Sequence, residues 1–140
     1  MPNALADTGV WYAMFDRGDE HSSDVADKAA ELERCRIVIP WPTFYETLRT
    51  RLVRNRPALQ RFREYLKRPN LEYLDDTSYR EGALELAFSS SLAPRPRPLS
   101  MIDCLIRLIL DDTGVKTHVL ATFDNAHFID VCRKRGIRMV

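Results

Sequence analysis

The apolar residues of this chain change spacing repeatedly, from short stretches typical of strands to longer segments typical of helices. Strand-like stretches are expected at 3–6, 37–39, 71–74, 118–121 and 137–140. Between them, apolar residues recur at i, i+3 and i+4, which predicts helices at 22–34, 43–55, 57–67, 77–92, 100–112 and 126–135. Strands that alternate with helices favour an α/β fold, a three-layer α/β/α sandwich with a mostly parallel central sheet.

The clearest break in the helical pattern is AlaProArgProArgPro at 93–98. Three prolines at alternate positions stop a helix, because each lacks a backbone N–H and blocks the preceding turn. The stretch is too short for a domain linker, so we expect a loop between two helices. A chain of 140 residues fits one domain, and we expect a single domain over 1–140.

Membrane and disulfide-framework proteins are disfavoured by the sequence. The apolar run at 10–15 is far shorter than the about 20 residues that cross a bilayer. No basic start followed by a long apolar segment is present, so we expect a cytoplasmic protein without a membrane partner. Cys35, Cys104 and Cys132 form no CxxC pair, and the last two lie in apolar helical patterns, where we expect buried side chains.

Charge is distributed unevenly along the chain, although the formal net charge is only +1. Residues 49–68 carry eight basic side chains against the single acid Glu64, a local charge of +7 that leaves −6 elsewhere. The basic residues are Arg49, Arg51, Arg54, Arg56, Arg61, Arg63, Lys67 and Arg68. A basic stretch beside an acidic remainder is typical of a protein that handles a polyanion, and equally of two solvated helix faces.

Four acidic residues fall where an open α/β sheet binds its ligands, outside the carboxyl ends of the strands. Asp7 directly follows the first predicted strand, and Asp124 comes three residues after the 118–121 strand. Glu46 lies in the early turns of the helix after 37–39, and Asp103 in the first turn of helix 100–112. The sequence therefore predicts that four carboxylates from distant parts of the chain meet at one edge of the sheet.

Each of these acids also has a purely structural interpretation. Asp7 could cap a following helix, Asp103 could stabilise its helix N-terminus, and Asp124 could form a turn with Asn125. Carboxylates among apolar neighbours, such as Asp103, are seldom fully buried unless they are paired or bind a metal. For one position the structural interpretation is favoured, and for the set of four a shared site is favoured.

A cluster of carboxylates has a chemical consequence. Two unit charges 4 Å apart repel by about 4 kcal/mol at an effective dielectric constant near 20, so such a site takes up protons or cations. Hard oxygen ligands select Mg²⁺ or Mn²⁺. Because a divalent ion activates water and polarises a phosphoryl oxygen, the predicted chemistry is metal-assisted hydrolysis of a nucleic-acid backbone.

Four motifs now suggest a family. They are AlaAspThr at 6–8, ProThrPheTyrGluThr at 42–47, LeuSerMetIleAsp at 99–103 and AlaThrPheAspAsnAlaHisPhe at 121–128. In this order and spacing, over nearly the whole chain, they resemble the PIN-domain nucleases, and among these a VapC-type toxin of a bacterial toxin–antitoxin pair.

The resemblance implies a single PIN domain with an acidic quartet of Asp7, Glu46, Asp103 and Asp124. Thr8 and Thr122 match hydroxyl residues beside the quartet, whereas Gly9 stands where the family often has serine. It also implies Mg²⁺ or Mn²⁺ as cofactor, cleavage of single-stranded or looped RNA, a homodimer, and a cognate antitoxin protein.

On this interpretation the basic helices would hold the RNA backbone near the acids, because phosphate contacts position a strand. The residues expected to do so are Arg49, Arg51, Arg54 and Arg56. Tyr45, Phe62 and Tyr65 could stack on bases or belong to the core. His127 could contact substrate or metal, or be an exposed helix residue.

AspThrGly at 7–9 is also the active-site triplet of aspartic proteases. Those enzymes pair two copies in an all-β fold, whereas this chain has one copy and at least six helical segments. A haloacid-dehalogenase phosphotransferase needs an acid where Gly9 stands. Two alternatives stay open: a housekeeping PIN-domain RNase, and a non-catalytic module that binds RNA or protein.

Overall fold

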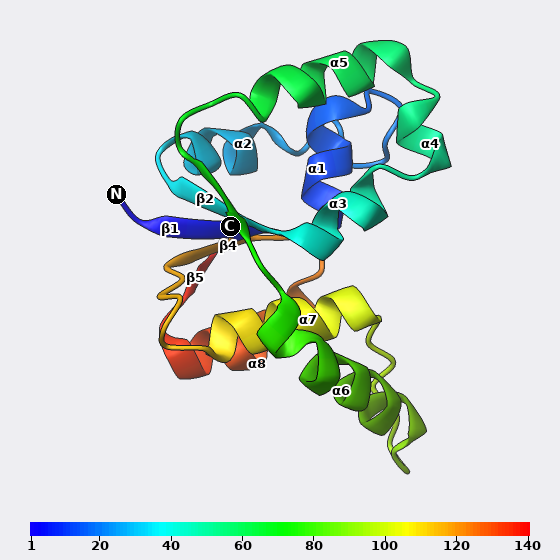
Figure 1. Ribbon diagram of the computed structural model, residues 1–140, viewed down its shortest axis with the longest axis vertical. Coiled ribbons are helices and arrows are strands. Elements are labelled where there is room, and N and C mark those ends of the chain that lie inside the picture. The colour runs from blue at the N-terminus through cyan, green and yellow to red at the C-terminus, as the bar shows by residue number, and fades with distance from the viewer.

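The computed structural model describes residues 1–140 and contains an all-parallel five-stranded sheet between two layers of helices (Figure 1). The strands are β1 (Asn3–Ala6), β2 (Arg36–Pro40), β3 (Leu71–Leu74), β4 (Val119–Ala121) and β5 (Arg138–Met139). Their order across the sheet is β3-β2-β1-β4-β5, so the first strand lies at the centre. The predicted three-layer α/β/α sandwich is confirmed, and every predicted strand is present with small shifts at its ends.

The helices of the N-terminal half cover one face of the sheet and those of the C-terminal half cover the other (Figure 1). The first face carries α1 (Thr8–Phe15), α2 (Ala26–Glu33), α3 (Trp41–Thr47), α4 (Thr50–Val53) and α5 (Arg56–Tyr65). The second carries α6 (Arg80–Leu92), preceded by a 3-10 turn at Thr77–Tyr79, α7 (Met101–Asp111) and α8 (Asn125–Arg135). The proline-rich stretch at 93–98 connects α6 to α7, as predicted.

Alternation along the central strands divides the core into two parts, because successive side chains of a strand point to opposite faces. Ala4 and Ala6 pack on the side of α1 and α5, whereas Leu5 packs on the side of α7 and α8. On the α1 side Trp11 packs against an aromatic cluster of α1 and α5.

The apolar spacing predicts no helix at Thr8–Phe15, and this was wrong, because the structure has α1 there. Six of its eight residues are buried, so the segment shows no alternation between apolar and polar residues around the helix. Helical spacing is visible only where one face meets water. Asp7 caps this helix: its side chain accepts a hydrogen bond from the Thr8 N–H.

The predicted helix 43–55 is two helices, and the prediction of one was wrong. The break lies at Leu48 and Arg49, where the Arg49 backbone is extended, with ψ of 174°. In a continuous helix Leu48 and Leu52 would share a face, but Leu52 is fully buried and Leu48 is exposed. The Arg49 guanidinium Nε donates to the Glu46 carbonyl at 3.0 Å and so satisfies an acceptor that the helix end leaves open.

The helix predicted from 22 begins at Ala26, and the polar SerSerAsp at 22–24 lies in turns before it rather than at its cap. All three cysteines are free and buried, which confirms the expectation for Cys104 and Cys132. No helix combines the length and the hydropathy that a bilayer-spanning segment needs.

Candidate active site

A cavity of about 350 Å³ opens at the carboxyl edge of the sheet, where β1 and β4 end. All four predicted acids line it, although they come from four separate segments of the chain. The lining residues are Asp7, Thr8, Gly9, Tyr12, Glu20, His21, Glu46, Arg49, Ser100, Asp103, Phe123 and Asp124. The fold therefore brings together the acids that the sequence places after strands and in first turns.

Asp7 is the most deeply placed of the four, with 7 % of its surface exposed. Its backbone N–H donates to the Ala121 carbonyl at 2.9 Å, which extends the pairing of β1 with β4 by one step. One carboxylate oxygen accepts from the Thr8 N–H at 2.8 Å and the other from the Thr122 hydroxyl at 3.2 Å. These bonds fix the side chain at the floor of the cavity.

Glu46 reaches the cavity from α3 and is oriented by α1. The Thr8 hydroxyl donates to Glu46 Oε2 at 2.8 Å. The Tyr12 hydroxyl donates to the Glu46 backbone carbonyl at 3.2 Å. Thr8, predicted as a supporting hydroxyl, therefore joins the first helix to the acid of the third.

Asp103 is buried in the first turn of α7, where Ser100 caps the helix by accepting from the Asp103 N–H at 3.2 Å. His127 on α8 faces it, with Nδ1 3.1 Å from Asp103 Oδ2 and 3.8 Å from Asp124 Oδ2. That nitrogen is buried and makes no hydrogen bond of good geometry. The alternative of an exposed helix residue is therefore wrong: His127 turns towards the acids.

Asp124 lies at the rim of the cavity, at the start of α8, with an exposed carboxylate that caps no backbone N–H. Its own N–H donates to the Thr122 hydroxyl oxygen at 2.9 Å. Because the same hydroxyl donates to Asp7, Thr122 connects the floor acid to the rim acid.

Burial and mutual repulsion dominate the electrostatics of the cavity. Burial, and next the nearby Asp103 carboxylate, raise the pKa of Asp7 to about 6, against the bonds from Thr8 and Thr122 that lower it. No lysine or arginine forms an ion pair with any of the four carboxylates. Arg49 lines the cavity but bonds to a backbone carbonyl rather than to a carboxylate.

No three His, Cys, Asp or Glu side chains stand close enough together to hold a metal ion as they are placed. The donor set nevertheless fits a hard divalent cation in its chemistry, since four carboxylates line one cavity and the Thr8 and Thr122 hydroxyls bond to two of them. Burial and the nearby Asp103 carboxylate raise the pKa of Asp7, and a cation bound beside this carboxylate would lower it again.

The PIN-domain family model matches residues 4–134, nearly the whole chain. The chain belongs to the PIN-domain family. PIN domains are generally nucleases, and they usually use divalent metal ions. No curated protein matches the chain.

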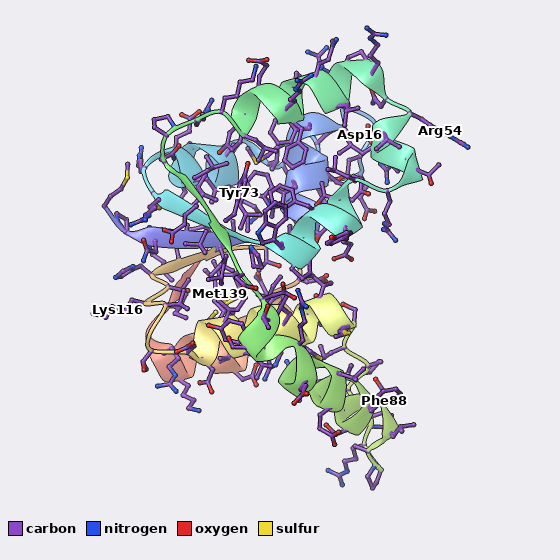
Figure 2. All side chains as sticks on the ribbon, in the orientation of Figure 1. Asp16, Arg54, Tyr73, Phe88, Lys116 and Met139 are labelled. Atoms are coloured by element: carbon purple, nitrogen blue, oxygen red, sulfur yellow. The ribbon has the colours of Figure 1, made fainter.

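The predicted RNA-binding arginines of this PIN domain differ in their surroundings. Arg49 lines the cavity, and Arg51 pairs with Asp16 at 3.0 Å and Asp19 at 3.4 Å. Arg54 and Arg56 are exposed and form no ion pair, and Figure 2 shows Arg54 pointing away from the body of the molecule.

The three aromatic residues considered for base stacking also differ in their exposure to solvent. Phe62 and Tyr65 are buried in the aromatic cluster around Trp11, so a stacking role for them is wrong. Tyr45 is 81 % exposed.

One wall of the cavity was not predicted from the sequence. His21 stacks on Phe123, with ring centroids 4.1 Å apart, and Lys28 lies over the same ring. Glu20 stands beside His21 in the turns that precede α2. Irregular segments carry no apolar period, so the only available signal was that Phe123 precedes Asp124.

Proposed function

We propose that this PIN domain is a Mg²⁺- or Mn²⁺-dependent endoribonuclease and the toxin of a type II toxin–antitoxin pair. The observation that carries the proposal is the meeting of Asp7, Glu46, Asp103 and Asp124 in one cavity without a lysine or arginine on any carboxylate. Such a site repels negative charge, so a phosphodiester can enter only together with cations.

Asp7 and Asp103 would hold the ion at the floor of the cavity, with Glu46 and Asp124 completing the oxygen donors. A divalent ion supplies Lewis-acid polarisation of the phosphodiester and of the attacking water when it is bound. Thr8 and Thr122 orient the carboxylates through the bonds described above. Arg49 lies in the same cavity, where its guanidinium can contact the RNA backbone, and exposed Arg54 and Arg56 can extend that contact.

An apolar stripe on α6 supports the proposed homodimer and antitoxin. Leu84, Phe88 and Leu92 recur every four residues and are all exposed. The helix extends beyond the other helices of its layer, and Phe88 lies on this extension (Figures 1 and 2). Exposed apolar patches of this kind mark protein interfaces. The proposal also places the protein in the cytoplasm, where its RNA substrate and its antitoxin are found.

The deciding experiment is cleavage of a structured RNA by the purified chain with Mg²⁺ or Mn²⁺, with and without a chelator. Asp7→Asn and Asp103→Asn should lower the rate by more than about a hundredfold, because loss of a mere supporting partner of a metal ligand already costs about 10–100-fold. Asp24→Asn, which alters an exposed acid outside the cavity, should cut like the parent.

Equal cleavage by the Asp103→Asn protein would identify the activity as a contaminant and overturn the proposal. The toxin assignment has its own test, arrest of growth on expression. Arrest that depends on Asp7 and Asp103 supports a toxin, and cleavage without arrest supports a housekeeping RNase. Arrest by the variants as strong as by the parent supports a non-catalytic module that titrates a partner.

A further inference from the structure

A second hollow lies beside the acidic cavity, bounded by α3, α6 and α7, with a volume of about 310 Å³. Glu46 lines both hollows, so they share a wall. A volume near 300 Å³ is at the small end of the range for ligand pockets, which is about 300–1,000 Å³. The second hollow, here called the side groove, is thus sized for one small group next to whatever occupies the acidic cavity.

The side groove is mainly apolar, in contrast to its neighbour. Ala83 and Leu105 form buried parts of its lining. Tyr45 and Met101 form its open edge, with 81 % and 46 % of their surfaces exposed. A tyrosine exposed to this extent leaves an aromatic face without a protein partner, and none of the aromatic pairs in the structure includes Tyr45.

The positions of these two edge residues tie the side groove to the acids. Tyr45 immediately precedes Glu46 on α3, and Met101 stands two residues before Asp103 on α7. Each of these two helical turns therefore carries an acid that lines the acidic cavity and an aromatic or apolar side chain that lines the side groove. A nucleotide chain that extends from the acids past their shared wall at Glu46 would bring its next nucleotide to the side groove.

One ion pair, between Arg80 and Asp76, completes the lining of the side groove. Arg80 Nε and Nη2 donate to the two oxygens of the buried Asp76 carboxylate, at 2.9 and 3.1 Å. This pairing holds the guanidinium in one orientation, and its remaining N–H groups make no other hydrogen bond. Arginine N–H groups suit acceptors on base edges and on phosphates.

We propose that the side groove is a base subsite, in which Tyr45 stacks on the nucleobase next to the scissile phosphate while Arg80 faces that nucleotide's polar edge. The inference rests on the proposed ribonuclease function in taking RNA as the occupant. Single-stranded nucleic acid is held in this way, by aromatic side chains under the bases and cations along the backbone.

Size and hydrogen-bonding groups favour RNA over a segment of another protein. Asp76 balances the charge of Arg80, but the guanidinium N–H groups that Asp76 does not use can donate to the polar edge of a nucleotide. A docked helix is about 10–12 Å wide with its side chains and needs a longer trough than this hollow. A protein partner has the α6 stripe, whose outer residues Phe88 and Leu92 do not line the side groove.

The test measures RNA binding separately from cleavage. All proteins carry Asp103→Asn so that the RNA stays intact, and the probes are fluorescent oligoadenylate and oligouridylate, followed by anisotropy. Tyr45→Ala should weaken oligoadenylate binding by about tenfold or more, the size of one lost base–aromatic stack. The loss should be smaller for oligouridylate, because a pyrimidine offers less stacking surface. Tyr45→Phe should bind like the parent.

Tyr73→Ala is the matched control, since it removes a half-exposed tyrosine that does not line the side groove. Equal affinity of the Tyr45→Ala and Tyr45→Phe proteins would overturn the inference, as would an equal loss in the Tyr73→Ala protein. A change of mass in sedimentation without a change in RNA affinity would identify the side groove as a protein interface and also overturn it.

Failure of this inference and failure of the proposed function give different results. If the parent cuts RNA but Tyr45→Ala alters neither affinity nor the preferred base at the cut, the base subsite is rejected and the nuclease stands. If the parent cuts no RNA yet binds it through Tyr45, the base subsite stands within a non-catalytic RNA-binding module.

Discussion

The acids of this molecule fall into two groups that differ in what neutralises them. On the α8 side of the fold, the Asp130 carboxylate accepts a hydrogen bond from each Nη of Arg107, both at 2.8 Å, and another from Arg97. These arginines hold the pKa of Asp130 far below its usual range. In the acidic cavity Asp7 has no such partner, and its pKa is raised to about 6.

Arginine partners are available to acids elsewhere in the chain, so their absence from the cavity carboxylates is a local feature of the site. Asp16, at the end of α1, is paired with Arg51, and Asp76, beside the side groove, is paired with Arg80. Arg49 even enters the cavity and turns its Nε to a backbone carbonyl. Asp16, Asp76 and Asp130 thus have arginine partners within the chain, whereas the four cavity acids have none, and only His127 lies beside Asp103 and Asp124.

The strongest test of this contrast is Asp7→Asn in the absence of divalent ions. The folded-state pKa of Asp7 lies above its ordinary value of 3.8, so the folded chain favours the protonated form. That contribution is complete below about pH 4 and is lost as the pH rises through about 6. Asn, which is always neutral, should raise the free energy of unfolding at pH 7 by about 2–3 kcal/mol.

Urea denaturation at several pH values measures this gain, which should vanish below about pH 4, where the parent is protonated too. Mn²⁺ should raise the melting temperature of the parent and much less that of the variant. Equal stability of the two proteins at pH 7 would remove the distinction between the two groups of acids.

A second test removes the hydroxyl that connects two cavity acids. Thr122→Val keeps the shape but deletes the bond to Asp7 and the acceptor of the Asp124 N–H. Cleavage should fall by about tenfold, in line with losses of metal-supporting bonds. Because the Thr122 bond lowers the pKa of Asp7, the acid limb of the pH–rate profile should move to higher pH.

Thr117→Val is the control for that variant, since the Thr117 hydroxyl is buried without a hydrogen-bond partner and lies outside the cavity. Its rate and pH profile should match those of the parent. If both valine variants behave alike, Thr122 only fills space.

The smallest effect on stability is expected at Asp130, an acid of the group that arginine neutralises. Asp130→Asn removes the partner of Arg107, and should lower the free energy of unfolding at pH 7 by about 1 kcal/mol, since the half-exposed carboxylate is screened by solvent. The pKa of Asp130 is lowered by folding, so this loss should fade as the pH falls, opposite in sign to Asp7→Asn. RNA cleavage should be unchanged, and a large loss of cleavage would show that the two groups are coupled.

The sequence was sufficient for the sheet and for the position of the acids, for a common reason. Short buried strands stand out between polar turns, and residues that follow parallel strands must meet at one edge. Asp7 and Asp124 could be placed from this rule alone, and Asp103 from an acid inside an apolar helix.

Other features depend on packing that no local pattern records. The helix α1 is surrounded by the core, so its sequence lacks a polar face. Tyr45 and Tyr65 have the same chemistry, yet Tyr45 is exposed and Tyr65 lies in the aromatic cluster, because the helices that carry them present them to different surroundings. His21 and Phe123 meet only because irregular segments fold over the cavity.

The short outer strands of the sheet limit how copies of this molecule can associate. β5 consists of two residues, and β3 of four, one of which, Glu72, pairs with Arg36 of the adjacent strand. Brief, charged borders of this kind discourage a neighbouring chain from adding its own backbone to the sheet. The helices, with the exposed apolar stripe on α6, therefore offer a better surface for association than the edges of the sheet.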